Sequence, residues 1–110
     1  MQLTDLEPRW FSHDASNEIH GLSFLCPHCK ESRLGILFSH SIAHDQPVPT
    51  DDSITHLPRT EHVWQITGDT PTFDGEKHGG FENITLLPSV DASASGHWHG
   101  FITNGVVTTV

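Results

Sequence analysis

The chain has 110 residues, with 14 Asp or Glu against five Lys or Arg, so its formal net charge is −9 with neutral histidines. This charge opposes binding to the nucleic-acid backbone, which requires a basic face. No stretch approaches the ~18 apolar residues of a membrane-spanning helix, and residues 1–10 lack the apolar core of a signal peptide. We therefore expect a soluble cytoplasmic protein with a single domain over residues 1–110.

The first half of the chain shows the alternation that is typical of strands. Leu22 and Phe24 share one face of a strand that ends at Cys26, and residues 34–38 alternate in the same way. Residues 26–29 would then form the tip of a hairpin between these two strands. This is the arrangement of a zinc knuckle.

The second half contains three further strand regions. Residues 62–67 are rich in β-forming side chains, and residues 81–87 alternate. Residues 98–103 and 106–110 flank Asn104-Gly105, a pair that readily adopts the positive φ angles of a type I′ turn. The end of the chain therefore carries the strongest hairpin signal in the sequence.

Two polar stretches, residues 39–61 and 68–80, separate these elements and are expected to be long loops. No window shows helical periodicity with caps, apart from a possible short turn near residues 4–7. We expect an all-β fold: a small, single-domain antiparallel sheet or sandwich with a zinc-knuckle hairpin and long polar loops.

Cys26 and Cys29 are the only two cysteines, and they enclose Pro27 and His28. Two residues between cysteines allow one backbone turn to direct both sulfurs at a zinc ion. Alternatively, the pair is a redox couple, which normally sits at a helix N-terminus beside a βαβ unit, or two ordinary thiols. With no second Cys-x-x-Cys, histidines must complete a metal site, and His28 could replace one cysteine as a ligand.

His97 and His99 lie two residues apart, so on a strand their imidazoles point to the same face. They could chelate one metal ion together, or one could bind metal while the other acts as a base. Alternatively, both face solvent in a histidine-rich chain. The remaining histidines are more typical of surface positions than of metal sites. These seven residues are His13, His20, His40, His44, His56, His62 and His78. Among them, His20 and His62 are reserve ligands because they fall at strand positions.

Ser89 follows a predicted strand shortly before this histidine pair. A serine nucleophile needs a neighbouring imidazole as base and a third group to orient that imidazole. His99 could supply the base if the two strands are adjacent, with Asp91 or Glu82 as the orienting acid. Otherwise Pro88-Ser89 is a turn signal.

Five segments resemble a family of small phage and prophage proteins of unassigned function, and together they span most of the chain. They are LTDLEPRW (3–10), LSFxCP (22–27), WxxTGDT (64–70), LxPSV (86–90) and WHGFITNG (98–105). The last segment is the most specific. Relatives of this family in bacterial operons for ubiquitin-like conjugation are regarded as zinc-containing, serine-dependent peptidases. The resemblance implies Ser89 as nucleophile, His99 as the active-site histidine, and Cys26 with Cys29 as metal ligands.

The chain departs from this family just before Trp98, where relatives often carry a further cysteine. Here the segment is Ser95-Gly96-His97, so His97 would substitute as a nitrogen ligand. The family's cysteine cluster is also often Cys-x-Cys-like, which gives His28 a possible ligand position.

Two functions follow from these patterns. The first, which the family resemblance implies, is a zinc-binding, serine-dependent peptidase or hydrolase with Ser89 as nucleophile and His99 as base, acting on a protein or a ubiquitin-like tail. The second is a non-enzymatic, zinc-stapled β domain that binds a host or phage protein. Both predict a protein or peptide partner, no nucleic acid and no membrane, and a location in the cytoplasm of a bacterial host cell.

Overall fold

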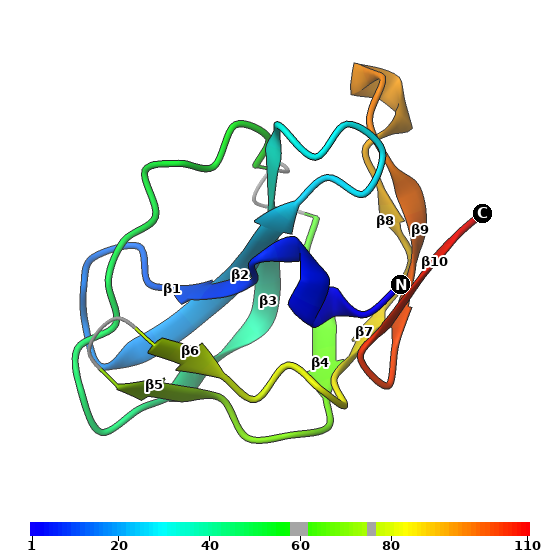
Figure 1. Cartoon of the computed structure of the whole chain (residues 1–110). Coiled ribbons are helices and arrows are strands. Elements are labelled where there is room, and N and C mark those ends of the chain that lie inside the picture. The colour runs from blue at the N-terminus through cyan, green and yellow to red at the C-terminus, as the bar shows by residue number, and fades with distance from the viewer. Residues whose placement is uncertain (58–61, 75–76) are drawn as a thin grey trace.

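The structure is a computed structural model that describes residues 1–57, 62–74 and 77–110 (Figure 1). In the described residues, the only helical segments are two short 3-10 helices, η1 and η2, and η1 covers the turn predicted near residues 4–7. The predicted all-β fold class is therefore confirmed. The elements in chain order are η1 (Leu3–Leu6), β1 (Arg9–Phe11), β2 (Glu18–Leu25), β3 (Arg33–Ala43), β4 (Gln65–Thr67), β5 (Thr72–Asp74), β6 (Lys77–Gly79), β7 (Thr85–Leu87), β8 (Val90–Asp91), η2 (Ser93–Ser95), β9 (His99–Thr103) and β10 (Val106–Thr109).

The first sheet has the strand order β1-β2-β3, and both pairings are antiparallel. Phe24 lies opposite Leu34, and Leu22 lies opposite Ile36. All four side chains are buried, as the predicted alternation requires. Residues 26–32, which we call the cysteine turn, connect β2 to β3.

β3 is longer than predicted, so the expectation that residues 39–43 begin a polar loop was wrong. Backbone pairing with the start of β2 continues through Ile19 with Ile42 and Glu18 with Ala43. The side chains in this part of β3 are largely exposed, and the alternation that marks a half-buried strand is therefore missing. The second expected loop, residues 68–80, contains the β5–β6 hairpin. Residues 58–61 and 75–76 of these stretches lie outside the described residues.

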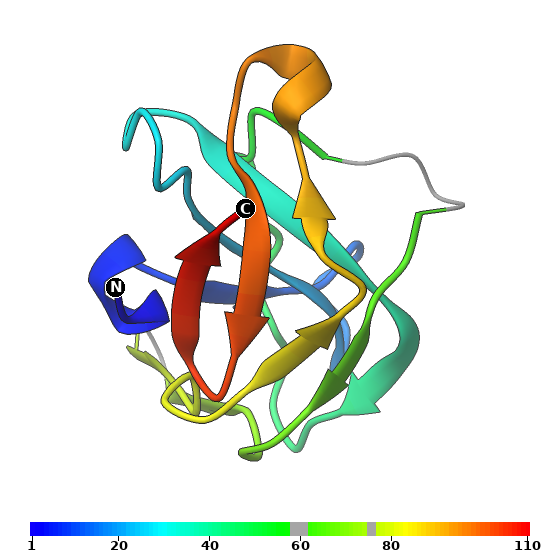
Figure 2. The same ribbon diagram turned by 90° about the vertical axis from the view of Figure 1, so that its right-hand side faces the viewer.

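The second sheet has the order β10-β9-β8, and a separate two-stranded pair joins β4 to β7 (Figure 2). Asn104 and Gly105 connect β9 to β10 with φ angles of 49° and 76°, the sign that a type I′ turn requires. Trp98 and Ile102 point into the core, whereas Phe101 is exposed. This inward and outward alternation agrees with the prediction for residues 98–103.

The hydrophobic core joins the two sheets through aromatic side chains. Trp10 on β1 stacks on Phe81, with ring centroids 4.3 Å apart. Phe24 on β2 meets Trp98, next to β9, edge to face at 6.0 Å. Such pairs contribute about 0.5–1.5 kcal/mol beyond their area burial. The core thus fixes the segment before β9 against the end of β2, where the cysteines lie.

Candidate metal centre

The cysteine turn brings its two sulfurs to the end of β2. The Cys26 N–H donates to the Ser32 carbonyl at 2.8 Å, and the Lys30 N–H donates to the Cys26 carbonyl at 2.8 Å. Lys30 has a φ of 57°, in the left-handed region that lets the chain reverse. Both thiols are free; Cys26 is fully buried and Cys29 is half-buried. The turn therefore places the Cys26 sulfur in the core and the Cys29 sulfur nearer the surface.

His97 reaches the same place from the far end of the sequence. After η2, Gly96 adopts a φ of 76°, and the His97 N–H donates to the Ala92 carbonyl at 3.0 Å. Only glycine adopts such a φ readily, so Gly96 allows the chain to fold back before β9. The His97 Nδ1 lies 3.8 Å from the Cys29 Sγ. In Figure 1 the cysteine turn and η2 lie at the same end of the molecule.

One ligand atom from each of Cys26, Cys29 and His97 lies within 4.8 Å of the other two. We call these three residues the ligand group. Two sulfurs and an imidazole at this separation could hold a metal ion. The prediction that a histidine from the 97–99 segment joins the two cysteines is thus compatible with the structure, and that histidine is His97.

The surroundings of Cys29 favour its thiolate, which is the form that binds metals. Backbone N–H groups of Ser32 and Glu31 point at the sulfur, and the Ser32 and His97 side chains also contact it. Together these hydrogen bonds outweigh the effect of burial and lower the pKa of the Cys29 thiol to about 6.

His28 and His99 lie near the ligand group without being part of it. His28 is exposed. It lines a shallow surface depression with His97 and His99, bounded by the end of β10. The structure therefore gathers three histidines around this depression, but only His97 has a ring nitrogen close to both sulfurs.

The proposed nucleophile and base lie on neighbouring segments. His99 pairs with Asp91 across β9 and β8, and its Nδ1 lies 4.0 Å from the Asp91 Oδ1. Ser89 precedes β8, and its carbonyl accepts a hydrogen bond from the Trp64 indole at 3.2 Å. Within the described residues, no hydrogen bond joins the Ser89 hydroxyl to His99. Of the two acids named from sequence, Asp91 is the one beside this histidine.

Asp91 is itself held by the start of η2. Both the side-chain hydroxyl and the backbone N–H of Ser93 donate to the Asp91 Oδ1, at 2.6 and 3.0 Å. These hydrogen bonds, with a smaller contribution from His99, lower the pKa of the Asp91 carboxyl. Asp91 is therefore a fixed carboxylate next to His99.

His56 is a neighbour of the ligand group that the sequence did not reveal. Its ring lies edge to face on the His97 ring, with centroids 4.0 Å apart. Its backbone forms an isolated parallel bridge with Leu34 of β3. No spacing rule links residue 56 to residues 26, 29 or 97, because the long loop places it by tertiary contacts alone.

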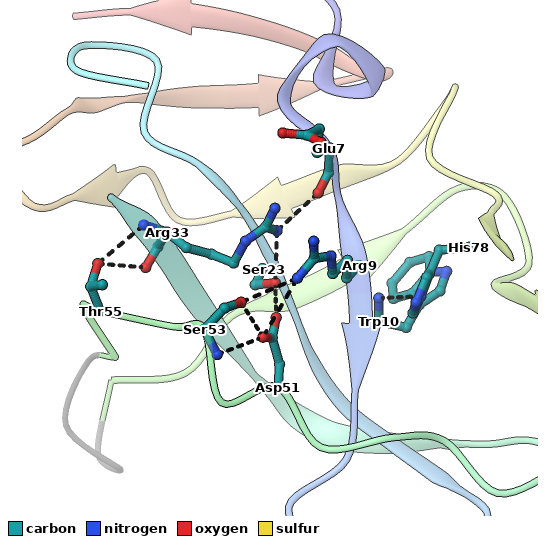
Figure 3. A network of polar contacts seen from close by, with 9 residues as sticks. All are labelled: Glu7, Arg9, Trp10, Ser23, Arg33, Asp51, Ser53, Thr55 and His78. Carbon is teal, nitrogen blue, oxygen red and sulfur yellow. Dashed lines mark hydrogen bonds and ion pairs between the residues drawn. The ribbon is translucent and has the colours of Figure 1, made fainter. Parts of the chain in front are cut away.

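A partly buried polar network fixes the loop that carries His56 (Figure 3). The Arg33 guanidinium donates to the Ser23 hydroxyl at 3.1 Å, and Ser23 in turn donates to Asp51. Burial opposes ionisation of Asp51, but hydrogen bonds from Ser23 and Ser53 outweigh it and lower the pKa of the carboxyl. Further along, Thr55 accepts a hydrogen bond from the Arg33 N–H at 3.1 Å. Strands β2 and β3 thereby hold the loop at two points.

Comparisons with protein-family models, with curated proteins and with solved structures found no match. In the described parts of the chain, no helix has the length and apolar character needed to span a membrane.

Proposed function

We propose that this protein is a zinc-stapled β domain that acts as a protein-binding module. The observation that carries the proposal is the ligand group, in which the turn between the first two long strands meets the segment before β9. A metal ion bound there would tie the two three-stranded sheets together at one end. Ions of this kind add their binding energy to the stability of the fold.

The donor set favours zinc. Thiolate and imidazole are the ligands of structural zinc sites, whereas magnesium and calcium select oxygen ligands. A redox role for the two cysteines has less support, because such pairs normally open a helix. Here the cysteine turn runs directly into strand β3.

Elemental analysis of untagged protein, purified without metal resin, tests the proposal first. We expect one zinc per chain, and a Cys26→Ser variant that is zinc-free and largely unfolded. A Cys29→Ser variant tests zinc loss in a protein that stays folded, because Cys29 is only half-buried and its replacement disturbs the core less. Protein that contains no zinc, and does not take it up when it is supplied, would rule the proposal out.

The resemblance to phage and prophage proteins supports a host or phage protein as the partner. A net charge of −9 favours a partner with a basic surface, since complementary charge speeds association. Affinity capture from host cells should retain such a partner on the zinc-loaded domain and lose it at high salt. Equal capture by the zinc-free Cys26→Ser variant would contradict a role for the stapled fold.

A second candidate, a serine-dependent peptidase, has one specific observation in its favour. The Asp91 carboxylate lies 4.0 Å from the His99 Nδ1, and a catalytic triad likewise places an acid beside its histidine. Ser89 precedes Asp91 by two residues in the chain. Cleavage of a ubiquitin-like fusion would reveal this activity. Loss of cleavage in Ser89→Ala, with zinc content unchanged, would support the peptidase. Cleavage that survives this substitution would remove Ser89 as nucleophile.

A further inference from the structure

We propose that His56 is the fourth ligand of the metal ion and binds it through Nε2. This inference rests on the proposed zinc site and completes its coordination. The ligand group supplies three donors, whereas structural zinc sites are almost always four-coordinate. With His56 the site would be a closed Cys2His2 centre, and no position would remain open for a substrate or water.

The position of the His56 ring is the first support. Its centroid lies 4.0 Å from that of His97, with the two rings inclined at 63°. Two imidazoles bound to one tetrahedral zinc would have their centroids about 5 Å apart, given Zn–N bonds of about 2 Å. The two centroid distances differ by about 1 Å. The His56 nitrogens lie outside the group of ligand atoms within 4.8 Å of one another, so the imidazole has to rotate toward the sulfurs to bind the ion.

Thr55 contacts the ring nitrogen of His56 that would face away from the ion. The Thr55 hydroxyl lies 2.9 Å from the His56 Nδ1 and 3.2 Å from the Arg33 carbonyl, which also accepts the backbone N–H groups of Thr55 and His56. Metal binding through Nε2 requires the ring proton on Nδ1, and the Thr55 oxygen is placed to accept that proton. Ligating histidines commonly have their second ring nitrogen held in this way.

The backbone around His56 is already in place. The Gly35 N–H donates to the His56 carbonyl at 2.9 Å, and the His56 N–H donates to the Arg33 carbonyl at 3.2 Å. The polar network of Figure 3 holds the same loop through Asp51 and Thr55. Because the main chain is fixed on both sides, only the imidazole has to move when the ion binds.

The other two nearby histidines are less suited to the fourth position. His28 is exposed and follows Pro27 within the cysteine turn itself, where adjacent residues rarely reach one ion. His99 is oriented toward Asp91 on the opposite strand. Neither ring contacts His97 as His56 does. His28 nevertheless provides a matched control, since it is a solvent-facing histidine at the same end of the molecule.

Cobalt(II) titration of the zinc-free protein tests the assignment, because the cobalt spectrum reports coordination number and thiolate count. We expect tetrahedral bands in the wild type that do not respond to added azide. In His56→Ala, cobalt affinity should fall about 10-fold or more, and azide should change the bands. His28→Ala should match the wild type in both respects.

His56→Cys gives a readout that loss of folding cannot imitate. If residue 56 is a ligand, a third thiolate joins the ion and the charge-transfer absorption rises about 1.5-fold over that of two thiolates. Wild-type affinity and spectrum in His56→Ala, or an azide response in the wild type, would overturn the His56 assignment alone. A wild type that binds no cobalt or zinc would overturn the proposed function together with it.

Discussion

The two ends of this molecule each depend on a histidine from a distant segment, but they use it differently. At the end that carries the ligand group, which we call the metal end after its candidate site, His97 has a ring nitrogen close to the sulfurs of Cys26 and Cys29. At the other end, the His78 Nδ1 accepts a hydrogen bond from the Trp10 N–H at 3.0 Å (Figure 3). The first arrangement offers three donor atoms that an ion could bridge, whereas the second is complete as a hydrogen bond.

Packing explains the difference. Trp10 is buried and also donates its indole N–H to the Gly79 carbonyl at 2.7 Å. Strand β6 is thereby held on β1 by two hydrogen bonds and an aromatic core, and we call this contact the Trp10 latch. At the metal end, Cys26 and Trp98 are buried, but Cys29, His56 and His97 are only half-buried. Apolar burial secures the whole latch, whereas the outer part of the ligand group lacks it and would gain stability from a bound ion.

The largest effect is expected from removing the metal. A ligand at 1,000 times its dissociation constant stabilises the folded state by about 4 kcal/mol. A chelator should therefore lower the free energy of unfolding of the wild type by about that amount, measured by urea denaturation. The zinc-free Cys29→Ser variant is the control and should not respond. If the wild type is equally stable with and without chelator, a bound metal ion does not stabilise the metal end.

A smaller effect is expected from weakening the latch. Trp10→Phe keeps an aromatic ring on Phe81 but deletes the hydrogen bond to Gly79, at a cost of about 1–2 kcal/mol including the smaller ring. Zinc content should not change. Trp98→Phe is the matched variant at the metal end. It should cost less, because its lost partner, Thr109, is exposed and can bond to water. If urea denaturation shows that Trp10→Phe and Trp98→Phe lose the same free energy of unfolding, the Trp10 latch is not the more strongly held contact.

The smallest effect is a change in pH dependence. Burial, with a further contribution from Arg9 and Arg33, lowers the pKa of His78, while Asp51 opposes the shift. The unfolded chain thus binds this proton more readily than the folded protein. The contribution of His78 is present above the unfolded pKa, near ~6.5, and is lost as pH falls from there through the folded pKa.

His78→Asn tests this dependence. The asparagine Oδ1 can take the place of Nδ1 as acceptor for the Trp10 N–H, and it does not titrate. We expect near wild-type stability at pH 7.5 and a shallower loss of unfolding free energy between about pH 7 and 5. His40→Asn, at an exposed position of β3, should retain the wild-type slope. Parallel slopes for all three proteins would show that the latch is insensitive to His78 protonation.

The features that the sequence predicted are those with a local signal. Asn104-Gly105 marked a turn whose two positive φ angles are present, and the alternation around Phe24 and Leu34 marked two paired strands. The candidate ligand His97 was marked by the His97-Trp98-His99 pair, because a metal site with only two cysteines needs histidines to complete it. In each case, neighbouring residues in the chain carried the information.

The features that the sequence did not predict depend on distant contacts. Residues 39–43 extend β3 through backbone pairing although their side chains are largely exposed. The β5–β6 hairpin is short and is held by the Trp10 latch, 68 residues from His78. His56 contacts the His97 ring from a loop that hydrogen bonds to Arg33 hold in place. No periodicity in the chain encodes such contacts.

The separation between Cys29 and His97 also sets the order in which the protein can mature. The β2–β3 hairpin is local and can form soon after it leaves the ribosome, but His97 follows 68 residues later. At roughly 5–20 residues per second, the two thiols would wait roughly 3–14 s for that imidazole. During this interval the nascent chain offers a two-sulfur site to any soft metal or oxidant in the cell. For the proposed zinc site, correct metal loading would thus depend on the timing of synthesis as well as on affinity.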